Sequence, residues 1–337
     1  AVPQKNGDHS LRALCLDARK GKIEWDKEVL HEDGSTAPRI HFKNSHASPT
    51  PLVHGKRLFV HFGHMGTACL NLTGDILWKN TSLSYAPVHG NGGTPIVVND
   101  LLVFSCDGAS NPFVVALDVE SGKVRWKTPR KANAEKRFSF STPLLIEVKG
   151  QKQIISPGSN EVSALDPKDG KEIWRVRYQG YSIIPRPVYG HGLVFLSTGY
   201  EAPTLLAIRA DGKGDVTRTH IAWKTRRAAP HTPSPLLVGD ELYMVSDGGV
   251  ASCLDAKTGK VHWQERLPGG FSASPLYANG KVYFQDEEGT GFVIKAGKRF
   301  EEVARNEMNE RTFASYAVVD RALFLRTESR LFRFETR

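Results

Sequence analysis

The sequence predicts an all-β fold, a β-propeller of four-stranded antiparallel blades, from three observations. A short hairpin ending in a tryptophan recurs along the chain, and it uses all six tryptophans of the protein. Successive tryptophans are 53, 48, 48, 49 and 40 residues apart, a period typical of four-stranded propeller blades. Stretches with the apolar period of an amphipathic helix are essentially absent.

The repeated hairpin is clearest in the segments VVALDVESGKVRW and VSALDPKDGKEIW. An alternating apolar run predicts a half-buried strand, an Asp ends it, and a Gly four residues before the Trp permits a tight turn. The second strand contains the Trp, whose flat indole we expect to dock against the neighbouring copy. The predicted docking residues are Trp25, Trp78, Trp126, Trp174, Trp223 and Trp263, and the copy ending at Trp223 has a lengthened turn.

Each complete repeat is expected to contain four strands. In the copy that includes Trp126, these are residues 94–99, 100–106, 113–118 and 123–127. The same pattern predicts six complete blades, at residues 48–80, 94–127, 141–176, 185–225, 232–265 and 272–305.

The two ends of the chain predict partial blades. Residues 12–25 match only the last two strands of a blade, and residues 313–337 contain three strands. We expect one domain over residues 1–337 with eight blades, the N-terminal part of the first blade being missing. If the two partial blades combine into one, the propeller has seven blades.

The composition is that of a globular protein. With 337 residues, 24% charged and 40% hydrophobic, the chain can bury a large core, and no apolar run approaches the roughly 18 to 20 residues of a membrane span. The net charge of +9 includes small clusters at Lys127–Arg130–Lys131 and Lys224–Arg226–Arg227, which we interpret as solvated surface, with an anionic partner as the alternative. No aromatic-interleaved basic motif indicates nucleic acid.

The four cysteines predict no disulfide and no cysteine metal site. Cys15, Cys69 and Cys253 occupy the same position in three hairpins, so they should lie too far apart to pair. Cys106 stands alone, and no CxxC motif is present.

The A-L-D-x-x-x-G-K-x-x-W hairpin resembles the tryptophan-docking motif of the PQQ-like (quinoprotein-type) β-propeller family, over almost the whole chain. Members include PQQ-dependent alcohol dehydrogenases and a non-catalytic, BamB-like lipoprotein of outer-membrane assembly. The chain is similar to secreted propellers of the planctomycete type. The resemblance implies a periplasmic or secreted bacterial protein, monomeric, whose targeting segment is not present in this chain.

Candidate ligand-binding residues lie in loops expected on one face, at the mouth of the central channel. These are His46, His64, His89, Asn91, Tyr181, Arg186 and His231. Such side chains suit an anion, a metal or a quinone, or they form structural hydrogen bonds between loops. No short-range ligand spacing in the sequence supports a metal site at His46, His64 and His231. A hydrolase triad of Ser141, His231 and Asp107 would have to be recognised by geometry.

The family's dehydrogenases use an adjacent pair of cysteines, a Trp beneath the quinone and a Ca²⁺ bound by carboxylate and amide groups. This chain has no adjacent cysteines and no Trp outside the docking positions, although Asn91, Asn160 and Asp107 could coordinate a cation. We therefore expect no cofactor, with PQQ and Ca²⁺ as the alternative.

The functional expectation is a non-catalytic binding or scaffold propeller of the cell envelope, similar to the BamB-like assembly factor. Its partner would be a protein, or a small ligand at the channel mouth, and neither nucleic acid nor a membrane span is expected. The alternative is a quinoprotein-type, PQQ-dependent oxidoreductase acting on an alcohol or sugar.

Overall fold

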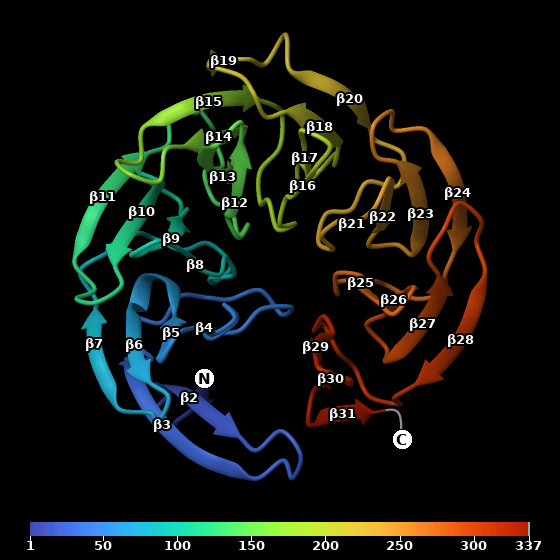
Figure 1. The fold of residues 1–337 in the computed structure, drawn as a ribbon. Helices are drawn as coiled ribbons and strands as arrows, with labels where there is room; N and C mark the ends of the chain where they lie inside the picture. Colours follow the sequence, from blue (N-terminus) through green and yellow to red (C-terminus); the bar gives the residue numbers. More distant parts are fainter. Residues whose placement is uncertain (336–337) are drawn as a thin grey trace. The chain divides into compact units, whose positions relative to one another are not determined.

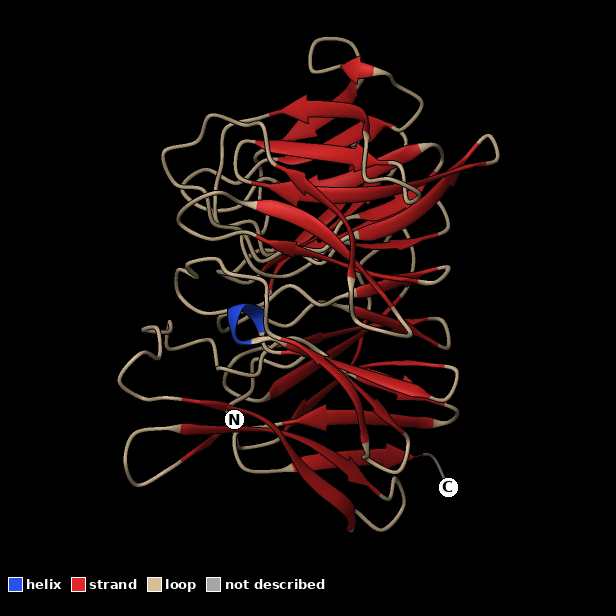
Figure 2. Cartoon of the chain, turned by 90° about the vertical axis from the view of Figure 1, so that its left-hand side faces the viewer, coloured by secondary structure: helices blue, strands red, loops and turns tan. Residues whose placement is uncertain are grey.

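The computed structural model describes residues 1–335, which form 31 strands and one short 3₁₀ helix, η1 (Gly63–Met65). Figure 2 shows this single helical turn among the strands. The fold class is an all-β, eight-bladed β-propeller of antiparallel sheets, which confirms the prediction. Within the described part, no helix has the length and apolar character needed to cross a membrane.

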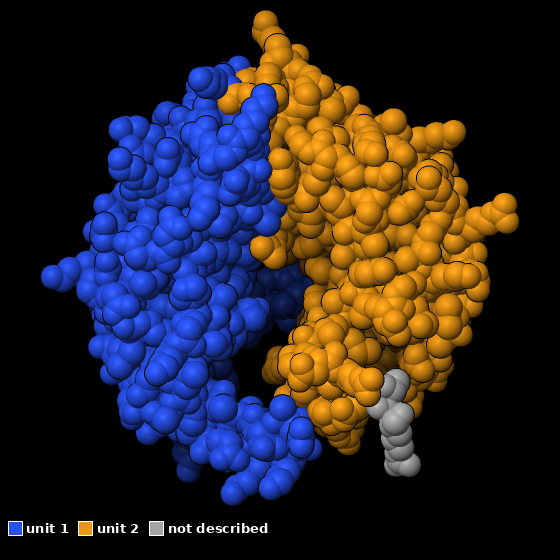
Figure 3. Space-filling model, viewed as in Figure 1, with its two compact units in different colours: residues 1–182, 213–215 blue, residues 183–212, 216–337 orange. Residues whose placement is uncertain are grey.

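The chain divides into two compact units (Figure 3). The first comprises residues 1–182 with 213–215, and the second comprises residues 183–212 and the chain from 216 onward. Each unit contains four of the eight sheets. The single domain expected from the sequence stays a prediction.

The sheets of the first unit follow one another in chain order (Figure 1). The first sheet contains β1 (Val2–Pro3), β2 (His9–Leu16) and β3 (Ile23–Glu32). The second contains β4 (Leu52–His54), β5 (Arg57–His61), β6 (Thr67–Asn71) and β7 (Ile76–Asn80). The third contains β8 (Ile96–Val98), β9 (Leu101–Cys106), β10 (Phe113–Asp118) and β11 (Val124–Pro129). The fourth contains β12 (Leu144–Val148), β13 (Gln151–Gly158), β14 (Glu161–Leu165), β15 (Glu172–Arg177) and the added strand β19 (Gly214–Asp215).

The second unit repeats the plan. Its first sheet contains β16 (Val188–Gly190), β17 (Leu193–Ser197), β18 (Leu205–Arg209) and β20 (Ile221–Thr225). The next contains β21 (Leu236–Val238), β22 (Glu241–Val245), β23 (Val250–Asp255) and β24 (Val261–Arg266). The third contains β25 (Leu276–Ala278), β26 (Lys281–Gln285), β27 (Thr290–Lys295) and β28 (Glu302–Glu307). The last contains β29 (Ala317–Val319), β30 (Ala322–Arg326) and β31 (Leu331–Glu335).

The two terminal segments form separate three-stranded sheets, so the blade count is eight rather than seven. The first sheet has one strand more than the two expected from the sequence, because Val2 and Pro3 pair with Ser10 and His9. A two-residue strand is too short to show a period in the sequence.

The tryptophans sit in nearly the same local geometry in most blades. A β-bulge precedes the last pairing of each hairpin, as between Ala116 and Leu117 in β10. The indole N–H then donates to a backbone carbonyl in the turn of the following blade, at 3.0 Å for the pairs Trp25–Leu72, Trp78–Val119, Trp126–Pro167, Trp223–Ala256 and Trp263–Gly297. Since each bond joins two sheets, the repeated Trp links successive blades.

Trp174 departs from this geometry. Its indole N–H donates to the Gln153 side chain of its own sheet, at 2.8 Å, and its side chain is fully buried. The lengthened turn before Trp223 contributes β19, which pairs in parallel with β15 beside Trp174. The insertion noticed in the sequence therefore adds an edge strand to the preceding blade.

A second repeated contact involves the Ser or Thr before the first strand of a blade, which in most cases directly precedes a proline. The Thr94 hydroxyl accepts from the Thr50 backbone N–H, and the Ser234 hydroxyl accepts from Arg186 N–H in the same way. Further bonds of this kind join Thr94 to Thr142, Ser234 to Ser274 and Ser274 to Ser315. The second, third and fourth sheets, and the first three sheets of the second unit, are thus joined to their neighbours both by the Trp bond and by this hydroxyl contact.

The apolar core lies between neighbouring sheets. One cluster packs Phe59 and Cys69 of the second sheet against Leu102, Phe104 and Val115 of the third. The four cysteines are free, as expected, and those at 69, 106 and 253 are buried.

Candidate functional site

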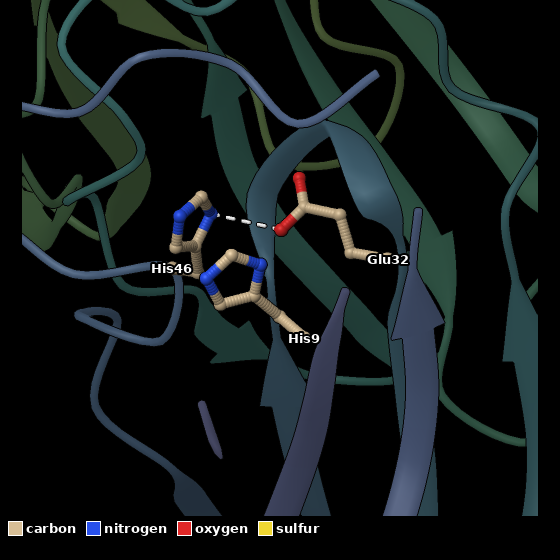
Figure 4. Close-up of side chains that lie close together, drawn as sticks. All are labelled: His9, Glu32 and His46. Carbon is tan, nitrogen blue, oxygen red and sulfur yellow. Dashed lines mark ion pairs between the residues drawn. The ribbon is translucent and has the colours of Figure 1, made fainter. Parts of the chain in front are cut away.

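The most unusual group of side chains lies at one end of the first sheet. His9 begins β2 and stands directly opposite Glu32, the last residue of β3, so both side chains emerge on one face. His46 reaches the same point from the loop between β3 and β4, and Figure 4 shows the three side chains turned toward one another. His46 Nδ1 lies 2.8 Å from Glu32 Oε2, and the His9 and His46 ring centroids are 4.2 Å apart.

Glu32 is buried without a sufficient set of protein partners. Its exposed fraction is 5% and that of His46 is 8%. Neither carboxylate oxygen has a hydrogen bond of acceptable geometry within residues 1–335, and His9 Nδ1 also has none. The short His46–Glu32 contact is therefore close but not directed along an N–H bond. Buried carboxylates of this kind are costly and uncommon in native proteins.

Burial shifts the titration of this group. It raises the pKa of the Glu32 carboxyl, because the charged form loses water. It lowers the pKa of His46, with a smaller contribution from His9. At neutral pH the His46 imidazole is consequently uncharged and has a free nitrogen lone pair.

A hydrogen-bonded chain approaches Glu32 from the other side. His64, in η1, places Nε2 3.7 Å from Glu32 Oε1. The Asn91 amide donates to His64 Nδ1 at 3.2 Å, and the Tyr85 hydroxyl donates to Asn91 Oδ1 at 2.9 Å. Because Nδ1 accepts in this arrangement, the ring proton is on Nε2, on the side of Glu32.

Gly63 permits this approach. Its φ of 65° lies in the left-handed region, and a Cβ built on it would lie 1.8 Å from Asn91 Cγ. A side chain at position 63 would displace Asn91 from His64. The glycine that opens η1 therefore positions both residues.

A small polar hollow lies beside this chain, within the first unit. It is lined by His61, Tyr85, Gly90, Asn91, Gly92, Gly93, Ser105, Asp107, Ser139, Phe140 and Ser141. Asp107 is not free there, because both its oxygens accept from Arg130 at 2.7 Å. Asn91 is likewise engaged by Tyr85 and His64.

His61, which lines the hollow, makes the stability of the fold depend on pH. Burial lowers the pKa of His61 to about 3, below the value of about 6.5 in an unfolded chain. The folded state therefore binds fewer protons than the unfolded state between these values, and stability falls as the pH decreases from about 6.5 toward 3. The expected slope is at most about 1.4 kcal/mol per pH unit.

The variant His61→Gln should lose this contribution, and its melting temperature should fall less steeply than that of the unmodified protein between pH 6.5 and 4.5. Differential scanning calorimetry at several pH values measures the slope. His54→Gln, at an exposed position, is the matched control. Equal slopes for both variants would show that His61 is not the group responsible.

The structure brings three of the predicted site residues together and separates the others. His46, His64 and Asn91 converge around Glu32. His89 and Tyr181 flank Phe138 instead, with ring centroids 5.4 and 5.6 Å from it.

The two remaining predicted residues belong to the second unit. The His231 backbone N–H donates to Asp247 Oδ2 at 2.7 Å, and its ring Nδ1 lies 3.5 Å from the same oxygen. The backbone N–H of Arg186 donates to Ser234. Neither belongs to the cluster around Glu32, and their ligand-binding roles stay predictions.

Sequence reasoning missed His9 and Glu32. Both lie outside the hairpin predicted over residues 12–25, because β2 begins earlier and β3 ends later than the sequence pattern indicates. The sequence could have indicated them only through their positions at the two open ends of one hairpin, next to the loops, where His9 and Glu32 face each other. Two bulges in the β2–β3 pairing, at Leu11/Arg12 and Cys15/Leu16, determine which residues of the two strands face each other. The alternation of apolar residues in the sequence does not reveal such bulges.

The fold and the repeated Trp hairpin define this molecule as a PQQ-like β-propeller. A family model described as outer membrane protein assembly factor BamB matches residues 7–146, 110–238 and 158–334. The chain belongs to this family. No curated protein sequence matches it.

Similar solved structures include a BamB protein, a designed protein and a dehydrogenase. BamB from Moraxella catarrhalis has 13% identity and a TM-score of 0.69, covering 99% of this chain and 97% of that one. The computationally designed Ika8 protein has 9% identity and a TM-score of 0.69, covering 97% and 91%. A europium-containing methanol dehydrogenase has 14% identity and a TM-score of 0.60, covering 87% and 72%. At these identities the likeness shows the fold alone.

The residues do not fit the PQQ and Ca²⁺ of quinoprotein dehydrogenases. The groups suggested by the sequence are already bonded. Asp107 accepts from Arg130, Asn91 is bonded to Tyr85 and His64, and the Asn160 side-chain oxygen accepts from the Gly180 N–H at 3.1 Å. Every indole N–H donates to a protein acceptor within the blades. The cysteines lie apart in separate strands or hairpins.

Proposed function

We propose that this protein is a non-catalytic binding propeller of the bacterial cell envelope, periplasmic or secreted, that engages a protein partner through its loops. The family model that matches this chain is described as an outer membrane protein assembly factor, and this description supports a role in the cell envelope. The observation on which the proposal rests is the bonded state of Asp107 and Asn91. Groups that would bind a cation beneath a quinone are instead used to join blades and loops.

A titration distinguishes this proposal from the oxidoreductase alternative. The full chain is mixed with PQQ and Ca²⁺ and followed by calorimetry and by absorbance. We expect no saturable heat and no shift of the quinone spectrum. Saturable one-to-one binding that is lost in Asp107→Asn would contradict the proposal and favour a dehydrogenase.

The partner is sought by site-specific photo-crosslinking in the cell envelope of the source bacterium. Phe42, in the loop between β3 and β4, is 74% exposed and provides a probe position on that loop. A probe at exposed Lys149, in the β12–β13 turn, is the control. A discrete protein adduct from position 42 alone supports the proposal, and its absence from both positions argues against a partner on this loop.

A further inference from the structure

Three potential metal ligands from separate parts of the chain meet at one end of the first sheet. One ligand atom from each of His9, Glu32 and His46 lies within 4.8 Å of the other two. Two of these residues are on paired strands and the third is on a loop, so no local sequence pattern brings them together. The convergence is a property of the fold.

The side chains of this group lack hydrogen-bond partners among the described residues. Both oxygens of Glu32 are buried without a hydrogen-bond donor in the described residues, and so is His9 Nδ1. Hydrogen bonds normally satisfy buried carboxylates, or a cation binds them. Here two imidazoles approach instead, and an uncharged imidazole brings a lone pair as well as an N–H.

We propose that His9, Glu32 and His46 bind one divalent transition metal ion, with Zn²⁺ as the representative ion. Two imidazoles and one carboxylate are a donor set typical of zinc and its neighbours in the periodic table. Ca²⁺ and Mg²⁺ prefer oxygen ligands throughout, so they suit this site poorly. This site is separate from the polar hollow and does not depend on the proposed envelope function.

The distances suit such an ion after small side-chain movements. Ligand atoms about 2.0 to 2.2 Å from zinc in a tetrahedron stand roughly 3 to 4 Å apart. The His46 Nδ1–Glu32 Oε2 distance is 2.8 Å, and the limit for the whole set is 4.8 Å. Rotation about side-chain bonds can bring the ligand atoms to the separations of a tetrahedral site. The strand pairing that places His9 opposite Glu32 does not need to change.

His64 would act as a positioning residue for this site. Its Nε2 lies 3.7 Å from Glu32 Oε1, the oxygen farther from His46 Nδ1 in the ion pair, and Asn91 fixes its ring from behind. Groups that orient a ligating carboxylate commonly contribute about 10-fold to 100-fold to metal affinity. Three protein ligands also leave a fourth coordination position open for water or another donor.

The first test is a zinc titration of the full chain after treatment with a chelator. We expect one Zn²⁺ per chain by calorimetry, with affinity reduced at least 100-fold in the double variant His9→Ala/His46→Ala. His64→Ala should weaken binding about 10-fold. His191→Ala removes the histidine–carboxylate pair with Asp240 in the second unit, at 3.3 Å, and is the matched control, with unchanged binding. Binding that persists in the double variant belongs to other histidines and overturns the proposal, as does the absence of stoichiometric binding.

The second test uses the melting temperature of Glu32→Gln with and without zinc. Without metal, the variant should melt at the same temperature as the unmodified protein or higher, because it removes an unpaired buried charge. With excess ZnSO₄, only the unmodified protein should be stabilised. If Glu32 is instead simply an ion-pair partner of His46, the variant melts lower in both conditions, and that result contradicts a metal site.

Cobalt provides a spectroscopic check that does not depend on stability. Co²⁺ alone, added to the metal-free chain, should give visible absorption bands of a low-coordinate site, and equimolar Zn²⁺ should remove them. A spectrum equal to that of aqueous Co²⁺ would exclude the His9–Glu32–His46 site.

Discussion

Replacing Arg130 by Met is expected to destabilise the fold by about 3 to 5 kcal/mol, because the change leaves the Asp107 carboxylate buried without its cation. The exposed fractions of the two side chains are 4% and 1%. Arg130 Nε and Nη2 each donate to one Asp107 oxygen at 2.7 Å, which is the bidentate geometry of the strongest ion pairs. Burial raises the pKa of the Asp107 carboxyl, and the charge of Arg130 opposes that change.

The guanidinium also joins two blades. Asp107 follows β9 and Arg130 follows β11 in the third sheet, while Nη1 and Nη2 donate to the Ser156 and Pro157 carbonyls of β13 in the fourth, both at 3.0 Å. Gly158 leaves the space for this group, since a Cβ there would lie 2.6 Å from Arg130 Nε. Loss of Arg130 therefore removes contacts between blades as well as an ion pair.

Urea unfolding measures the effect, and two further variants sharpen it. The double variant Arg130→Met/Asp107→Leu should recover part of the loss, because it removes the stranded charge. Arg57→Met breaks the exposed pair with Glu120 and should cost less than about 1 kcal/mol. Equal costs for Arg130→Met and Arg57→Met would show that burial of the first pair does not matter.

Arg130 also shows what the sequence could not reveal. Its neighbours Lys127 and Lys131 suggested a solvated basic cluster, and this interpretation of Arg130 was wrong. Along an edge strand, charged residues alternate with others on a mostly exposed face, so burial depends on what the next blade places above them. Here the fourth sheet contributes backbone carbonyls and a glycine, which a single repeat does not encode.

The repeating part of the fold was predictable because each blade repeats the same local chemistry. The strand–Asp–Gly–Trp pattern gave the hairpins of the six complete blades, including β27–β28 without its Trp. The candidate site was predictable only in part. His46 and His64 were recognised as loop histidines, whereas Glu32 and His9 depend on the exact strand register, which two bulges set. Side chains that meet across strand ends leave no periodic signal.

The second large effect is expected at the repeated tryptophan. Trp126→Ala should cost about 3 to 5 kcal/mol, the usual range for a large buried aromatic residue. Trp126 is 8% exposed, and its N–H donates to Pro167 at 3.0 Å. Its ring lies against the following turn, where a Cβ at Gly170 would be 2.5 Å from Trp126 Cε3. Removing the indole leaves both the core and that turn without a contact.

A short series separates the two contributions of the indole. Trp126→Phe retains an aromatic ring but loses the N–H, so it should cost less than Ala, with about 1 kcal/mol assigned to the hydrogen bond. Trp25→Ala provides the matched comparison: its N–H bonds to Leu72 and its ring meets Gly74 in the same way, but the side chain is more exposed. We expect a smaller cost there, measured by urea unfolding.

The order of these costs tests the docking role itself. If the Trp links blades, the loss of unfolding free energy depends on the area that the indole buries against the next turn. Trp126→Ala should then cost more than Trp25→Ala, although the two indole hydrogen bonds are equal in length. If the Trp only stabilises its own hairpin, the two costs are the same, since the same bulge follows the Trp pairing in both hairpins, at Ala116/Leu117 and at Cys15/Leu16. Equal costs would therefore remove the inter-blade role from a residue that the chain repeats six times.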